Sequence, residues 1–288
     1  MMTKGIRGIL IPIGGNEDKG NGKDDAHRID FIGDGILSHV VKQAGGLNAK
    51  IVVFPAASSI PEEVAQNYLD AFNKLGCTNV HVLQILEQSD SEKPEAIELV
   101  KSANAVLFSG GNQSKIIEKM IGTSLHRIML DKYRNEAFVI AGTSAGAMCM
   151  SHEMIAGGSN TDSFRKGTVH MAKGMGFIPE LIIDSHFIQR GRFGRLTEAV
   201  AKFPDLVGVG LAEDTGLIIR NKREFQVIGS GMAIVLDARK ATHNYRSLLD
   251  EGTPMTLIDL RTHILSNGDK FEINTRKIKV LPLDAEFV

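Results

Sequence analysis

The chain has 288 residues, enough to bury about 75% of the surface that its unfolded form exposes, so a disulfide scaffold is not required. Hydrophobic residues make up 43% and charged residues 23%, a composition that excludes a disordered or fibrous protein. Its 33 Lys and Arg residues nearly balance 34 Asp and Glu residues, and Trp is absent, which excludes a basic, aromatic surface for nucleic acid.

No segment predicts secretion or a membrane span. The first residues contain no apolar core followed by a small-residue cleavage site, and no apolar run approaches about 18 residues. Cys77 and Cys149 lie far apart and form no CxxC pair, which is typical of thiols used as small apolar side chains in a reducing compartment. We therefore expect a cytoplasmic protein that does not associate with membranes.

Roughly the first 150 residues alternate short β-branched runs with amphipathic stretches, which is typical of a parallel sheet covered by helices on both faces. Apolar residues recur at helical spacing from Ile36 to Ala44, and Gly45 predicts the left-handed end of that helix. A second helix is expected to begin near Ser59, whose hydroxyl would cap it, and to end near Gly76. The predicted strands are Gly8 to Ile13, Lys50 to Phe54, Asn79 to Ile85, Ala103 to Phe108 and Ala137 to Ala141.

Beyond about residue 180 the connections between apolar runs become much shorter, which favours antiparallel hairpins that extend the same sheet. The predicted strands here are Leu181 to Phe187, Leu206 to Gly210, Gly216 to Ile219, Phe225 to Ile228 and Met232 to Leu236. No repeat or Pro-rich linker marks a boundary. We therefore predict a single α/β domain over residues 1–288, with a mostly parallel central sheet, helices on both faces and C-terminal antiparallel hairpins.

The segment from Ala137 to Met148 predicts a catalytic nucleophile. A buried strand runs into Gly-Thr-Ser-Ala-Gly at residues 142–146 and then into small helix formers, which is the strand, turn and helix context of a nucleophile elbow. The two glycines let the backbone turn sharply, so the Ser144 hydroxyl would stand above the sheet and the Ala145 N–H would face an oxyanion. The alternative is a glycine-rich turn that binds a phosphate or nothing.

A second glycine turn follows a predicted strand in the same way, at Gly110 and Gly111. Paired glycines at the carboxyl end of a parallel strand allow the backbone to approach a ligand closely, at the edge where open α/β sheets bind substrates. The Gly111 N–H could therefore complete an oxyanion hole. A tight turn that only needs a positive φ is the alternative.

A serine nucleophile needs a base and an acid that orients the base. Of nine histidines, His186 is the best placed, because it ends an apolar strand near the same predicted edge of the sheet. Two carboxylates, Glu213 and Asp214, follow another short apolar strand, and either could hold the imidazole N–H. Spacing alone does not choose between them.

Three arginines follow the histidine, at positions Arg190, Arg192 and Arg195. They do not share one helix face, so they are expected on a loop and helix start where they can converge on substrate carboxylates or phosphates. The alternative is a solvated basic segment.

A phosphate loop and a metal centre are both excluded. The stretch from Gly14 to Asp24 resembles Walker A, but Glu17 replaces its first glycine and Asp24 stands where Ser or Thr would bind magnesium. No HExxH and no clustered His or Cys ligands occur, so neither a metal nor another cofactor is expected.

Taken in order, these motifs resemble the cyanophycinase branch of the peptidase E-like serine peptidases. The similarity runs from about Gly8 to Asn274 and includes Gly-Gly-Asn-Glu-Asp-Lys at 14–19, Gly-Gly-Asn-Gln at 110–113 and Glu-Asp-Thr at 213–215. It also includes the elbow and the Asp-x-His-Phe motif at 184–187 with its trailing arginines. Position 185 is Ser where we expect Gln in this family, a departure that bears on the substrate more than on the chemistry.

The resemblance implies a glutamine-amidotransferase-like fold in which Ser144 is the nucleophile, His186 the general base and Glu213 the orienting acid. It implies release of β-Asp-Arg dipeptides from cyanophycin, a polyaspartate that bears arginines, by a cytoplasmic homodimer without a cofactor. The residues expected to bind substrate are Gln113, Asp184, Ser185, Arg190, Arg192 and Arg195.

Two other functions remain open. An aspartyl dipeptidase would use the same triad on short Asp-x peptides, and comparing polymer with dipeptide substrates separates the two enzymes. A catalytically silent relative would use the arginines to hold a polyanion, and it would not react with a fluorophosphonate that labels active serines.

Overall fold

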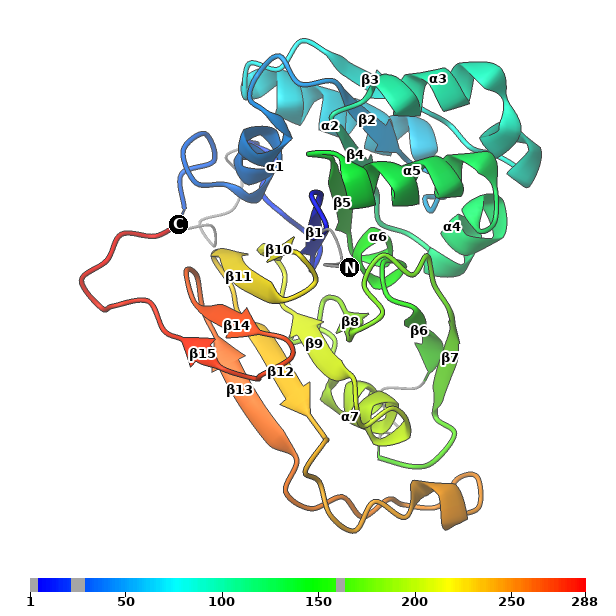
Figure 1. Cartoon of the computed structure of the whole chain (residues 1–288), viewed down its shortest axis with the longest axis vertical. Helices are drawn as coiled ribbons and strands as arrows, with labels where there is room; N and C mark the ends of the chain where they lie inside the picture. Colours follow the sequence, from blue (N-terminus) through cyan, green and yellow to red (C-terminus); the bar gives the residue numbers. More distant parts are fainter. Residues whose placement is uncertain (1–4, 22–28, 159–163) are drawn as a thin grey trace.

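Two sheets organise residues 5–21, 29–158 and 164–288, the part of the chain that this computed structural model describes (Figure 1). The larger sheet has nine strands in the order β15-β14-β11-β10-β1-β5-β4-β2-β3. Its parallel strands are β1 (Ile9–Ile13), β2 (Ile51–Phe54), β3 (Val80–Val82), β4 (Ala105–Phe108) and β5 (Val139–Thr143). Its antiparallel strands are β10 (Thr215–Arg220), β11 (Glu224–Gly229), β14 (Lys270–Glu272) and β15 (Ile278–Lys279).

Helices cover both faces of the parallel strands, which confirms the predicted α/β class (Figure 1). Successive residues of β1 alternate between the two cores, since Leu10 packs on one face of the sheet and Ile11 on the other. The core of Ile11 is closed by α1 (Ile36–Ala44) and α2 (Pro61–Lys74). The core of Leu10 is closed by α3 (Pro94–Ser102), α4 (Gln113–Met120) and α5 (Ser124–Asn135), with the short helix η1 (Gln88–Glu92) beside them.

The ends of the first two helices show where local signals succeed and fail. Helix α1 ends at Gly45 with φ 108°, as predicted. The expected cap at Ser59 is wrong, because α2 begins at Pro61 and its N-cap Ile60 has no side-chain cap. Proline needs no partner for a backbone N–H, and the Ser58 hydroxyl instead accepts the Ile60 N–H at 3.0 Å.

The C-terminal strands divide between two sheets, which corrects the expectation that all of them extend the first. Strands β8 (Leu181–Asp184), β9 (Val207–Leu211), β12 (Ala233–Asp237) and β13 (Arg261–Leu265) form a separate sheet in the order β13-β12-β9-β8. The second sheet is separate because it is buried on both of its own faces. Ile183 packs into the core shared with the first sheet, while Ile182 packs under α7 (Phe193–Lys202). This continuous core supports one domain, which stays a prediction.

Three further elements lie at the margins of the fold. They are the hairpin of β6 (Glu153–Gly158) and β7 (Val169–Lys173) and the short helix η2 (Arg246–Leu248). None of the helices formed by the described residues has the length and apolar character that a bilayer span needs.

Backbone hydrogen bonds join the two sheets where several strands end. The His186 N–H, just after β8, donates to Gly14 O after β1 at 2.8 Å. The Asp214 N–H, in the turn between β9 and β10, donates to Gly15 O at 2.9 Å. The carboxyl ends of β1, β5, β8 and β9 therefore meet at one place, and the candidate site lies there.

Candidate active site

Ser144 occupies a strained turn between β5 and α6 (Ala145–Met148), with φ 51° and ψ −109°. The flanking glycines are required sterically: a Cβ on Gly142 would lie 2.4 Å from Gly146 O, and one on Gly146 would lie 2.3 Å from Phe108 O. The Ser144 N–H is fixed by Ile13 O at 2.8 Å. This segment therefore has the geometry of a nucleophile elbow.

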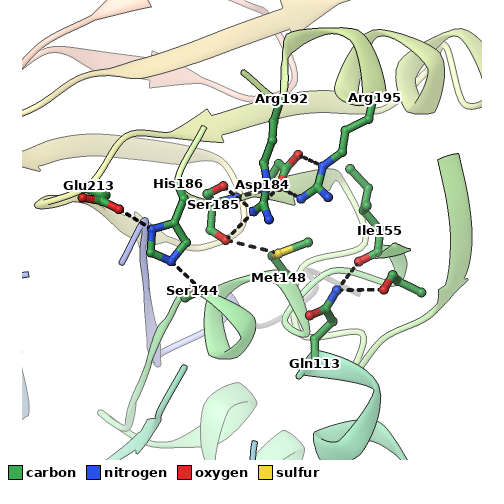
Figure 2. A network of polar contacts seen from close by, with 11 residues as sticks. Gln113, Ser144, Met148, Ile155, Asp184, Ser185, His186, Arg192, Arg195 and Glu213 are labelled. Atoms are coloured by element: carbon green, nitrogen blue, oxygen red, sulfur yellow. Dashed lines mark hydrogen bonds and ion pairs between the residues drawn. The ribbon is translucent and has the colours of Figure 1, made fainter. Parts of the chain in front are cut away.

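The Ser144 hydroxyl meets an imidazole and a carboxylate in line (Figure 2). His186 Nε2 lies 2.9 Å from Ser144 Oγ, and His186 Nδ1 lies 2.6 Å from Glu213 Oε1. The Asp214 carboxylate points elsewhere, accepting the Asp18 N–H at 3.1 Å and the Ser230 hydroxyl. The structure thus places Glu213 rather than Asp214 against the imidazole, the choice that spacing left open.

Gly15 makes room for the imidazole. Its φ is 109°, and a Cβ at this position would lie 2.3 Å from His186 Cε1. The glycine is therefore required both by backbone conformation and by the close approach of the ring. The sequence motif at 14–19 contained this signal, because the turn follows the first strand at the edge of the sheet where open α/β folds place their sites.

The environment of His186 favours the neutral form of its imidazole. Burial lowers the pKa of His186 below its ordinary value of 6.5, the Glu213 hydrogen bond raises it, and the positive charges of Arg190 and Arg192 lower it again. The net pKa is lowered, so the base form needed to accept the serine proton persists at mildly acidic pH.

A pH profile checks this electrostatic balance. Since neutral His186 is the active form, kcat/KM is expected to fall only as the pH drops through the lowered pKa, so the midpoint of the acidic limb lies below 6.5. Arg190→Gln removes one of the charges that lower this pKa, and it is expected to move the limb to higher pH. A wild-type midpoint above 6.5 would contradict the lowered pKa of His186.

A cavity of about 600 Å³ opens beside the three side chains. Arg190 and Gly111 line it together with Ser144, His186 and Glu213. The lining also includes residues that the sequence did not predict, among them Lys19, Ser58, Ser59, Asn67 and Tyr68. The Tyr68 hydroxyl was the available signal, since a tyrosine in a buried helical stripe needs a hydrogen-bond partner near by.

Glu17 is that partner, and it also contacts the residue before the nucleophile. It is 3% exposed and accepts hydrogen bonds from Tyr68 and, at 2.6 Å, from Thr143, while Lys19 Nζ lies 3.0 Å away. Burial would raise the pKa of Glu17, but Lys19 and the two hydroxyls outweigh burial and lower it. The residue that excluded a Walker A loop therefore holds Thr143, the neighbour of the nucleophile. Lys23 and Asp24, the rest of that pattern, lie outside the described residues.

Two backbone N–H groups are available near the nucleophile. Within the described part of the chain, neither Gly111 nor Ala145 donates its backbone N–H to another group. Gly110 packs against the nucleophile, since a Cβ there would lie 3.4 Å from Ser144 Cβ. The expected pair of oxyanion donors, Gly111 and Ala145, is thus free and close to Ser144.

Five of the six expected substrate-binding residues do not line this cavity, so their role in binding substrate stays a prediction. They make internal contacts instead, which Figure 2 shows. Asp184 is fully buried and pairs with Arg195 and with Arg192, the latter at 3.3 Å. Ser185 is also fully buried, and its hydroxyl contacts Met148 Sδ at 3.3 Å. Gln113 donates instead to the carbonyls of the β6 residues Ile155 and Ala156, at 2.9 and 3.1 Å.

Burial explains this internal network. A carboxylate removed from water must be paired, and Asp184 at the end of β8 receives Arg195 Nε at 2.6 Å. The order of Asp184 and the three arginines along the chain does not reveal which of them face each other, so the sequence suggested arginines that converge on a substrate. The arginines hold the segment that carries His186 rather than all pointing to the cavity.

Removal of one partner is expected to destabilise the fold. Arg195→Leu leaves the buried Asp184 carboxylate with a weaker partner, and we expect the free energy of unfolding to fall by about 3–5 kcal/mol in denaturant titrations. Lys101→Ala is the control, because Lys101 pairs with Glu98 at 2.7 Å on the exposed surface and its loss is expected to cost less than about 1 kcal/mol. Equal effects of the two changes would contradict this interpretation.

No three His, Cys, Asp or Glu side chains gather as metal ligands would within residues 5–21, 29–158 and 164–288. The polar groups around Ser144 are instead arranged for nucleophilic attack and proton transfer: a hydroxyl, an imidazole, a carboxylate and two free backbone donors.

Sequence comparison identifies the family. The model of peptidase family S51 matches residues 33–227. A cyanophycinase of Trichormus variabilis is 34% identical over 269 residues, covering 93% of this chain and 87% of the relative. A cyanophycinase of Geminocystis herdmanii is 32% identical over 276 residues, covering 96% of this chain and 97% of the relative.

Solved structures show the same fold. A peptidase from an acI-B1 actinobacterium superposes with a TM-score of 0.61 at 20% identity, covering 91% of this chain and 98% of that one. A putative peptidase E protein from Listeria monocytogenes gives a TM-score of 0.50 at 15% identity, covering 77% and 98%. The chain therefore belongs to peptidase family S51 and is a serine-type peptidase.

Proposed function

We propose that this protein is a cyanophycinase-like exopeptidase that hydrolyses the polyaspartate backbone of cyanophycin and releases β-Asp-Arg dipeptides. The array of Ser144, His186 and Glu213 beside an open cavity carries the proposal. The relatives named cyanophycinase, which this chain matches over 93% and 96% of its length, supply the substrate class.

The proposed reaction proceeds through an acyl-enzyme. Ser144 Oγ attacks the scissile carbonyl while His186 Nε2 takes its proton, and Glu213 holds the imidazolium by Nδ1. The N–H groups of Gly111 and Ala145 stabilise the oxyanion. His186 then gives the proton to the leaving amine, and a water molecule attacks the ester by the same route in reverse, freeing the acid product and Ser144.

Arg190 is proposed as the substrate-facing cation, because it alone of the three arginines lines the cavity. A guanidinium there would bind the free carboxylate of an arginyl branch or of the chain end. Asp184, Arg192 and Arg195 are proposed to act indirectly, by holding the segment between β8 and α7 that presents Arg190. Gln113 and the buried Ser185 would likewise contribute through the wall behind the site.

We also propose a cytoplasmic homodimer. The two cysteines are buried and free, which supports a reducing compartment, and the dimer follows from the family resemblance. Sedimentation of the purified protein and cell fractionation measure the two properties directly.

A comparison of two substrates tests the proposed function. Purified protein is incubated separately with cyanophycin and with Asp-x dipeptides, and the products are followed by mass spectrometry. The proposal predicts release of β-Asp-Arg dipeptide from the polymer. Cleavage of the dipeptides with intact polymer would make the protein an aspartyl dipeptidase, and failure to react with a fluorophosphonate would leave a binding protein without catalysis.

A further inference from the structure

The turn after β1 contacts every chain segment that supplies the three catalytic groups. Ile13 O accepts the Ser144 N–H, and Gly14 O accepts the His186 N–H, both at 2.8 Å. Asn16 Nδ2 then donates to Glu213 Oε2 at 3.2 Å. One short stretch thus contacts the nucleophile, the base and the acid, which come from three distant parts of the sequence.

The Glu213 carboxylate is more exposed to solvent than the imidazole that it contacts. Its side chain is 27% exposed, against 12% for His186, so water competes for its second oxygen. Gln189 Oε1 accepts only the Glu213 backbone N–H, at 3.2 Å, and therefore does not fix the carboxylate. Without a donor on Oε2, the carboxylate could rotate toward solvent and withdraw Oε1 from the imidazole.

The backbone at position 16 accepts either asparagine or glycine. Its φ is 49°, in the left-handed region where glycine is the least strained residue. An ionised carboxylate only accepts hydrogen bonds, so the side-chain amide supplies what a glycine could not, a donor aimed at Oε2.

We propose that Asn16 is a positioning residue that holds the Glu213 carboxylate against His186 through Oε2. The proposal rests on the triad proposed above and not on the identity of the polymer. Because Asn16 acts on the imidazole through Glu213, its loss changes the reactivity of Ser144 toward any electrophile, including one that does not fill the substrate cavity.

The charges around His186 predict the direction in which loss of Asn16 shifts the pH profile. Glu213 faces the ring from the β9–β10 turn and raises the His186 pKa, while Arg190 and Arg192, from the segment after β8, lower it. From the β1 turn, Glu17 and Lys19 line the same cavity and are paired with each other. A Glu213 carboxylate that moves away raises the His186 pKa less, so the acidic limb moves to lower pH.

The test measures how fast a small fluorophosphonate labels the full-length wild type and Asn16→Gly as a function of pH, with Tm recorded for each. Asn221→Gly is the matched control, because Asn221 also has a positive φ, 55°, but lies in the distant β10–β11 turn. We expect Asn16→Gly to react about 10-fold to 100-fold more slowly, with its acidic limb shifted to lower pH and its Tm at or above the wild-type value. The control is expected to match the wild type in rate and limb.

Several outcomes overturn the proposal. Labelling of Asn16→Gly at the wild-type rate would show that the amide does not hold Glu213. A slower rate with an unshifted limb, or with a lowered Tm, would show that Asn16 acts through the fold. Wild-type protein that fails to label overturns the triad and this proposal together, whereas protein that labels but leaves cyanophycin intact overturns only the substrate.

Discussion

Ser144→Ala is expected to lower kcat by about 10⁶, which corresponds to roughly 8 kcal/mol of transition-state stabilisation. The hydroxyl oxygen forms the acyl bond, and the hydroxyl proton is the one that His186 Nε2 accepts, at 2.9 Å. The alanine variant has neither group. Stability is expected to change little, because the backbone strain at φ 51° is set by the flanking glycines and remains in the variant. Steady-state release of dipeptide, together with thermal unfolding, measures both quantities.

The matched control for this change is Ser114→Ala. Ser114 is an exposed residue of α4. Its backbone N–H donates to the Asn112 side chain, and the residue does not line the cavity. Wild-type turnover is expected for this variant. Residual activity of Ser144→Ala within about 10-fold of the wild type would mean that another group makes the attack, and the proposed mechanism would be wrong.

Glu213→Gln is expected to lower kcat by about 10⁴ with little change in KM. The carboxylate accepts the His186 Nδ1 proton at 2.6 Å, which leaves Nε2 free to take the proton of Ser144. A glutamine amide that donates to Nδ1 would favour the opposite tautomer, in which Nε2 already carries a proton. Loss of the negative charge also lowers the His186 pKa further, so the acidic limb of kcat/KM is expected to move to lower pH.

Asp214→Asn separates the two carboxylates that the sequence left as alternatives. The Asp214 side chain holds the Asp18 N–H and the Ser230 hydroxyl, so its replacement is expected to reduce the free energy of unfolding and to lower kcat by less than about 10-fold. A loss of activity as large as that of Glu213→Gln would contradict the assignment of Glu213 as the orienting acid.

The parts of the fold that depend on local pattern could be predicted from sequence. Strands such as β4 and helix α1 are encoded by continuous burial or helical periodicity and by a terminal glycine, all within one segment. The second sheet could not be predicted. Whether β8 joins the first sheet or packs against it depends on long-range pairing with β9, which no pattern within residues 181–184 specifies.

The candidate site could also be predicted only in part. Ser144 and His186 were found because each lies at the carboxyl end of an apolar run in a distinctive local context. The choice between Glu213 and Asp214 depends on the folded turn, in which Glu213 contacts the imidazole and Asp214 binds the Asp18 N–H and the Ser230 hydroxyl. Glu17 and Asn16 act across more than one hundred residues of sequence, on Thr143 and Glu213, and such pairings are visible only in the folded chain.

Localisation of a covalent adduct tests the central claim most directly. The protein is reacted with a fluorophosphonate, digested and mapped by mass spectrometry. The account predicts one adduct, on Ser144 in the turn that follows β5, and none when His186 is replaced by alanine. An unmodified peptide around residue 144, or an adduct on another serine, would contradict the claim that the elbow presents an activated nucleophile.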